Sequence, residues 1–155
     1  TFYNYYSSKE QLFIEIFLKE NEKLKERFMT VDVDADPVQA VKEILEINFN
    51  GINSNPILKE WYNRDLFSKL EKEFQKRGGI KSLAETMNSE TLALIRKWKN
   101  EGKIRNDLDD DLILAIFNAI PYIDIHKKEI GLQYFPQILF YISEFVMRGL
   151  TDFRK

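Results

Sequence analysis

The feature that most limits the possible folds is a helical spacing of apolar residues that continues along most of the chain. Between residues 80 and 100, Ile80, Leu83, Met87, Leu94 and Trp98 keep this spacing over about six turns. Six glycines and four prolines interrupt the 155 residues, and no segment alternates apolar and polar residues between turn signals as a strand does. The sequence therefore predicts an all-α fold, a bundle of long helices.

Six long helices are expected, and local signals set their boundaries. The first begins near Ser8, because Ser7 with Glu10, or Ser8 with Gln11, has the spacing of a capping box. Proline at the first helical position follows an N-cap at Asp36-Pro37 and at Asn55-Pro56, where Ser54 is the alternative cap. The expected helices are residues 8–29, 37–52, 56–77, 80–100, 110–125 and 133–152.

Alternating acids before the second helix have a second interpretation, a calcium loop. Asp32, Asp34, Asp36 and Glu43 match the ligand spacing of an EF-hand. Pro37, however, stands where that loop needs a glycine with positive φ. The sequence therefore favours a helix cap, and no metal ion is expected.

The last two helices carry three further signals. The acids at 109–111 are predicted to cap the fifth helix and to face the positive end of its dipole. Pro121 removes the hydrogen bond to Phe117, which predicts a kink or a break. Residues 134–150 are apolar on nearly all sides, so this helix is either central to the core or meets another molecule.

The chain has few residues suited to catalysis. It has no cysteine, which excludes disulfides, thiolate zinc sites and cysteine nucleophiles. His126 is the single histidine and is expected to be structural or solvent-facing, and neither Gly-x-Ser-x-Gly nor His-Glu-x-x-His occurs. We therefore expect no enzyme activity and no cofactor.

Charge and hydropathy place the chain in the cytoplasm. The net charge of −2 gives no basic signature for nucleic acid on this chain. The longest charge-free stretch, residues 130–143, is shorter than the roughly 18 apolar residues that span a bilayer, and it contains Gly131 and Pro136. No signal peptide opens the chain. A cytoplasmic protein with no membrane partner is expected.

Large aromatic residues are frequent on the inward faces of the middle helices. In a helical bundle such rings usually belong to the core, yet rings with polar tips also line cavities for small, largely apolar molecules. Asn48, Asn63, Arg64 and Asn118 are nearby polar candidates. The candidate ligand-binding residues are Phe49, Trp61, Tyr62, Phe67, Trp98, Phe117 and Tyr122.

The first residues resemble a known family. Thr1-Phe2-Tyr3-Asn4-Tyr5-Tyr6, followed by Ser8-Lys9-Glu10 and Leu12-Phe13, is similar to the end of the recognition helix and the start of the next helix in TetR-type transcriptional regulators. The likeness is specific over residues 1–17 and looser at Gly102-Lys103-Ile104-Arg105 and at 145–150. It implies that residues 1–7 end a truncated helix-turn-helix domain and that residues 8–155 form a ligand-binding and dimerisation domain.

The resemblance also implies roles for residues near the start of the chain. Tyr3 and Lys9 would contact DNA phosphates, and Thr1, Asn4 and Tyr5 are weaker candidates for groove or backbone contacts. In this family the last two helices form a homodimer interface. The residues implied for it here are Ile116, Ile120, Phe135, Ile138, Leu139, Ile142, Phe145 and Val146.

The resemblance implies a ligand-responsive, dimeric DNA-binding regulator, a repressor that a small, largely hydrophobic effector releases from operator DNA. An alternative class also fits the residues: a helical small-molecule or lipid-binding module without DNA-binding activity. The sequence upstream of Thr1 discriminates between them, since a basic amphipathic helix and a helix-turn-helix turn there would favour the regulator. An all-α enzyme is the third and remotest option.

Overall fold

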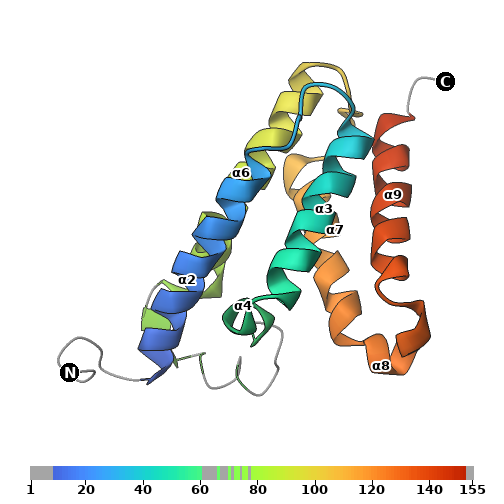
Figure 1. Cartoon of the computed structure of the whole chain (residues 1–155). Helices are drawn as coiled ribbons and strands as arrows, with labels where there is room; N and C mark the ends of the chain where they lie inside the picture. Colours follow the sequence, from blue (N-terminus) through green and yellow to red (C-terminus); the bar gives the residue numbers. More distant parts are fainter. Residues whose placement is uncertain are drawn as a thin grey trace. The chain divides into compact units, whose positions relative to one another are not determined.

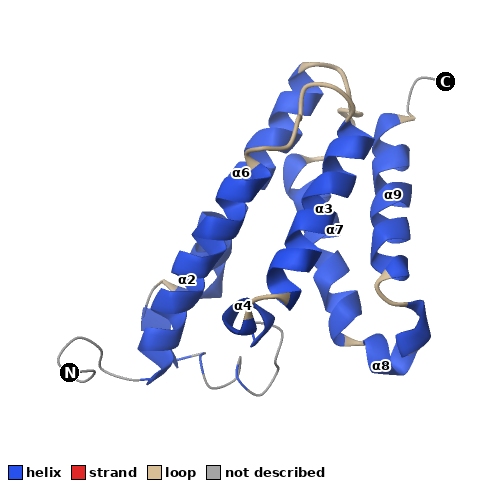
Figure 2. Ribbon diagram, in the orientation of Figure 1, coloured by secondary structure: helices blue, strands red, loops and turns tan. Residues whose placement is uncertain are grey.

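The structure is a computed structural model that describes residues 9–60, 66, 70, 72, 73, 75, 76 and 78–152. The described residues contain helices and no strand (Figure 2), so the fold is all-α, as the spacing of apolar residues predicts. The chain forms two compact units, one from the described parts of Thr1–Thr30 and Glu46–Thr86, the other from Val31–Leu45 and the described part of Met87–Lys155. Within the described residues, no helix combines the length and apolarity that crossing a membrane requires.

The first unit is built on α2 (Lys9–Phe28), which packs against the short helix α4 (Pro56–Glu60). The buried residues of α2 are Ile14, Phe17 and Leu24. Their spacings of three and seven residues place them on one face of the helix. The packing partner and not periodicity alone selects which apolar residues of α2 are covered.

The predicted caps at Asp36 and Asn55 are confirmed, whereas the cap predicted at Ser8 lies outside the described residues. The backbone N–H of Val38 donates a 3.0 Å hydrogen bond to the carboxylate of Asp36, at the start of α3 (Pro37–Asn53). The amide oxygen of Asn55 accepts hydrogen bonds from the N–H groups of Ile57 at 3.0 Å and Leu58 at 3.3 Å. Both caps satisfy donors that the first helical turn leaves without a carbonyl partner.

The second unit contains α6 (Gly79–Asn100) from residue 87 onward, α7 (Asp110–Ile125) and α9 (Gln137–Thr151). Helices α7 and α9 pack against each other and run in opposite directions (Figure 1). Their buried residues include Ile113, Ile120, Leu139 and Met147. A bond of 2.9 Å from the backbone N–H of Arg105 to the carbonyl oxygen of Leu150 attaches the end of α9 to the segment after α6.

The connection between α7 and α9 differs from the prediction. The short helix α8 (Lys127–Ile130) and the 3-10 helix η1 (Leu132–Tyr134) lie between α7 and α9, where no helix was expected before residue 133. The predicted helix 133–152 is interrupted at Phe135, whose backbone is extended before the cis peptide bond to Pro136. The interruption has a local cause, because a residue before proline is disfavoured in the helical region. By contrast, α7 continues through Pro121 without a break.

Charged residues join α6 to the start of α7. The carboxylate of Asp110 lies 2.6 Å from the Lys99 ammonium and 3.2 Å from the Arg96 guanidinium nitrogen Nε. The hydrogen bond from Lys99 lowers the pKa of Asp110, partial burial opposes this, and the bond from Arg96 lowers the pKa further. Asp109 occupies the N-cap position but makes no side-chain capping bond. The acids at 109–111 thus belong to a helix start, and no group of three potential metal ligands occurs among the described residues.

Candidate functional site

The predicted DNA-contacting residues lie at the edge of the described chain. Thr1, Tyr3, Asn4 and Tyr5 fall outside the described residues, and so does the predicted domain 1–7. Lys9 is the first residue of α2, and its side chain is exposed. An exposed ammonium at a helix start can reach a phosphate, so the role predicted for Lys9 stays a prediction.

The predicted ligand-binding aromatics have different environments. Trp61, Tyr62 and Phe67 lie outside the described residues. In the first unit Phe49 is half-buried on α3.

The other three aromatics lie in the second unit. Trp98 is buried, Phe117 is half-buried, and Tyr122 is 65% exposed. Because the indole N–H of Trp98 already bonds to a backbone carbonyl, this ring is held as part of the core. None of the described aromatics lines the cavity that the first unit contains.

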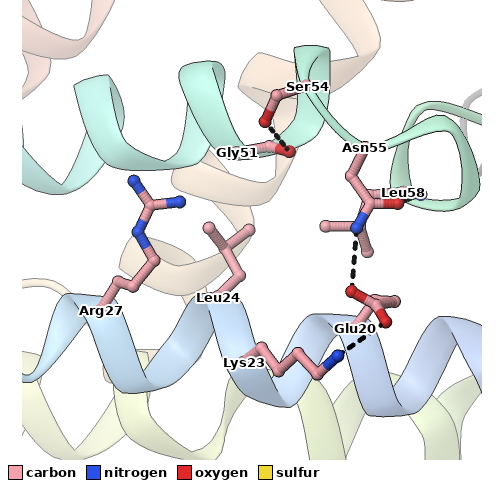
Figure 3. A pocket seen from close by; sticks show the side chains of 8 residues that line it. All are labelled: Glu20, Lys23, Leu24, Arg27, Gly51, Ser54, Asn55 and Leu58. Atoms are coloured by element: carbon pink, nitrogen blue, oxygen red, sulfur yellow. Dashed lines mark hydrogen bonds and ion pairs between the residues drawn. The ribbon is translucent and has the colours of Figure 1, made fainter.

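The first unit contains a cavity of about 160 Å³ between α2, the end of α3 and α4 (Figure 3). Its apolar residues are Leu24 and Leu58, which are 5% and 4% exposed. The absence of a side chain at Gly51 brings α3 close to α2, since an added Cβ would lie 2.4 Å from a methyl carbon of Leu24. The polar residues that line the cavity are Glu20, Lys23, Arg27, Ser54 and Asn55.

Most polar groups of the cavity bind one another. Glu20 accepts hydrogen bonds of 3.0 Å from the Lys23 ammonium and 3.0 Å from the Asn55 amide. The bond from Lys23 lowers the pKa of Glu20, partial burial opposes this, and the bond from Asn55 lowers the pKa further. Glu20 is therefore a carboxylate at neutral pH. The hydroxyl of Ser54 donates a 3.2 Å bond to the carbonyl oxygen of Gly51.

Arg27 is the exception among the charged residues of the cavity. Its side chain extends from α2 toward α3 (Figure 3), and its guanidinium has no hydrogen-bond or ion-pair partner within the part of the chain that the structure describes. A guanidinium carries five N–H donors in a planar fork that matches a carboxylate. The cavity thus has a mixed lining, with two leucines beside polar groups, and among its described residues Arg27 is the cation that has no partner.

The second unit carries a different feature, exposed apolar side chains on α7, η1 and α9. Among the described residues, every large hydrophobic side chain that is exposed lies between Leu112 and Phe145, apart from Met29. The rings of Tyr141 and Phe145 are 6.1 Å apart between centroids. We call the following set the α7–α9 apolar surface: Leu112, Tyr122, Tyr134, Tyr141 and Phe145.

The residues predicted for a dimer interface divide into three groups. Ile120 and Leu139 are buried within the chain itself, at 6% and 7% exposure. Phe145 is 65% exposed and belongs to the α7–α9 apolar surface. The remaining residues are half-buried: Ile116, Phe135, Ile138, Ile142 and Val146.

Sequence reasoning missed the cavity residues and the exposure of Tyr141. The basic residues Lys19, Lys23 and Arg27 recur at intervals of four, which is a visible signal of one basic stripe on α2. Nothing in the sequence shows that Ser54 and Asn55 lie beside that stripe, because this proximity depends on how α2 packs against α3 and α4.

Comparison with known proteins gives no relative for this chain. No family model, no curated protein and no solved structure matches it. The helical fold, the cavity and the apolar surface are therefore the observations on which a function must be argued.

Proposed function

We propose that this chain is the ligand-sensing and dimerisation part of a DNA-binding transcriptional repressor, released from its operator by a small, largely hydrophobic effector. The observation that carries the proposal is the α7–α9 apolar surface. On this surface the exposed rings of Tyr141 and Phe145 are neighbours, and adjacent exposed aromatic rings are typical of association sites. A second copy of the chain would cover this surface, and a two-fold dimer presents two DNA-reading heads.

The resemblance of residues 1–17 to TetR-type regulators supports the DNA-binding part of the proposal. On this proposal α2 connects the DNA-reading element to the sensing unit. The effector binds more tightly to the arrangement in which the two heads are badly spaced for the operator. It thereby shifts the population of dimers away from DNA.

DNA binding by the full-length protein tests the proposal. DNA would be selected from a random pool with the full-length protein, and its affinity measured by mobility shift at fixed salt concentration. We expect binding as a dimer, a loss with Tyr3→Ala or Lys9→Ala, and unchanged binding with Lys128→Ala as the control for a lost lysine. Failure to select any DNA, or binding that neither Tyr3→Ala nor Lys9→Ala weakens, would contradict it.

The cavity of the first unit favours a second candidate function, a small-molecule-binding module without DNA activity. Ligand sites usually combine apolar contacts with a few orienting polar groups, and this cavity has Leu24 and Leu58 beside Arg27. The same selection experiment separates the two functions. A dimer that binds a small molecule and selects no DNA would be the module.

A further inference from the structure

We propose that the cavity between α2, α3 and α4 binds a small monocarboxylate with a short apolar body, whose carboxylate pairs with Arg27. The proposal names the chemical class of effector, and it rests on the proposed function for what binding does to DNA affinity. The binding itself depends only on the first unit of the chain.

The charge of the cavity favours a monoanion. Glu20 contributes one negative charge and Lys23 and Arg27 two positive charges, so the lining carries one positive charge in excess. Glu20 and Lys23 neutralise each other at 3.0 Å, which leaves the guanidinium of Arg27 for the ligand. A dianion such as phosphate would leave a negative charge uncompensated beside Glu20, whereas one carboxylate balances the lining.

The size of the cavity sets the size of the ligand. A cavity of about 150 Å³ lined by apolar side chains holds benzene, and this cavity measures about 160 Å³. Leu24 and Leu58 provide its apolar contacts, and Gly51 also lines it. A ring or short branched chain therefore fits the interior while the carboxylate stays at the rim.

The position of the cavity connects binding to α2. Glu20, Lys23, Leu24 and Arg27 all belong to α2, and the facing residues belong to α3, α4 and the turn between them (Figure 3). A ligand that contacts α2 on one side and α3 and α4 on the other stabilises the arrangement of these helices in which it can make both contacts. Since α2 directly follows the segment that resembles a DNA-reading helix, this arrangement affects the spacing of the heads.

Titration calorimetry on the full chain with benzoate tests the proposal. Benzoate has a ring of suitable size and one carboxylate, and benzamide is its neutral counterpart of nearly equal shape. We expect benzoate to bind and benzamide to bind at least about tenfold more weakly, because a hydrogen bond to a charged group is the stronger kind. Undetectable benzoate binding at millimolar concentration, or equal binding of benzamide, would overturn the proposal.

Two charge variants on α2 locate the site. Arg27→Gln removes the available guanidinium, and we expect benzoate affinity to fall by about tenfold or more. Lys19→Gln removes one positive charge from the same helix outside the cavity and is expected to leave the affinity unchanged. Both side chains are exposed, so neither variant should disturb folding, which circular dichroism checks. Unchanged affinity in Arg27→Gln, or an equal loss in both variants, overturns the assignment.

The DNA experiment distinguishes this inference from the proposed function. If benzoate binds in the expected pattern but the full-length protein selects no DNA, the site stands and the regulator is rejected. If the full-length dimer binds DNA but benzoate does not bind, the regulator stands and this site is rejected.

Discussion

The indole nitrogen of Trp98 lies 2.9 Å from the carbonyl oxygen of Val33 and donates a hydrogen bond to it. Through this bond α6 holds the loop that precedes α3, within the second unit. In the same loop, the carbonyl oxygen of Asp34 accepts a hydrogen bond from the Lys103 ammonium. The carboxylate of Asp34 forms a 2.7 Å ion pair with Lys97. A buried ring and two half-buried lysines therefore position a connection that has no regular structure of its own.

Trp98→Phe is expected to destabilise the chain. The phenyl ring keeps most apolar contacts but has no donor, so the carbonyl oxygen of Val33 loses its partner. Trp98 is 3% exposed, and the lost bond together with the smaller ring should lower the free energy of unfolding by about 1–3 kcal/mol. Urea denaturation followed by circular dichroism measures the change.

Tyr122→Phe provides the control for the Trp98 substitution. Tyr122 is 65% exposed, so removing its hydroxyl should change the free energy of unfolding by less than about 0.5 kcal/mol. Equal denaturation midpoints for Trp98→Phe and the unmodified chain would show that the bond to Val33 does not stabilise the loop.

A second prediction compares two helical glycines. A methyl group at Gly51 would lie 2.4 Å from a methyl carbon of Leu24, whereas one at Gly149 would meet no atom within 4 Å. Alanine is favoured over glycine in a helix by about 0.5–1 kcal/mol. We therefore expect Gly149→Ala to raise the melting temperature and Gly51→Ala to lower it, since the new methyl group would force the buried side chain of Leu24 out of its present position.

A double variant tests whether Leu24 is the cause. Leu24→Ala removes the atoms that the new methyl group meets, so adding Gly51→Ala to Leu24→Ala should no longer destabilise. If Gly51→Ala lowers the melting temperature equally in both backgrounds, the close approach of Gly51 to Leu24 is not responsible.

The helix starts were predictable because their causes are local. Asp36 and Asn55 accept bonds from N–H groups two or three residues away, so a short window of sequence contains both partners. The bounds of α7 also match the expected residues 110–125, although Asp109 makes no side-chain capping bond.

The two late prolines show where local reasoning was insufficient. Pro121 lies inside α7, which continues, while the helix predicted around Pro136 divides into η1 and α9. A proline removes one hydrogen bond in either place, so its effect on the helix depends on the surrounding residues. At the second position Phe135, the residue before Pro136, has an extended backbone, and the helix is interrupted there.

The cavity and the α7–α9 apolar surface depend on contacts between residues that are far apart in the sequence. Glu20 and Asn55 are 35 residues apart, and their hydrogen bond exists only because α2 and α4 pack together. Periodicity likewise shows that residues 134–150 are mostly apolar, but the packing of α9 on α7 decides that Leu139 is buried and Tyr141 exposed.

Acid should weaken the attachment of the loop before α3. Hydrogen bonds and charge from Lys97 lower the pKa of Asp34 from 3.8, and bonds from Lys97 and Lys103 lower the pKa of Glu101 from 4.5. A carboxyl group whose pKa is lower in the folded chain than in the unfolded chain stabilises the folded state. This contribution is complete above the unfolded-state pKa and is lost as the pH falls through the folded-state pKa. The pKa of Lys97 is raised by the same contacts, first by its bond to Asp34, so its contribution is lost only in strong alkali.

The melting temperature should therefore be nearly constant between about pH 6 and 8 and fall between about pH 5 and 3. Asp34→Asn should reduce the melting temperature at pH 7 and make its fall in acid less steep. Glu26→Gln, on the exposed side of α2, is the control for a lost carboxylate. An acid profile of Asp34→Asn parallel to that of the unmodified chain would contradict the role of this ion pair.

The α7–α9 apolar surface predicts self-association through Phe145. Its ring is 65% exposed and lies beside Tyr141, at 6.1 Å between centroids. Sedimentation velocity at micromolar concentration should show a dimer for the unmodified chain. Phe145→Glu places a charge where a second copy would bury an aromatic ring, and we expect it to shift the chain to monomer. Met29→Glu makes the same kind of change at a residue that is 80% exposed on the other unit and should leave the dimer intact. A monomeric unmodified chain, or a dimer that survives Phe145→Glu, would show that this surface is not the site of self-association.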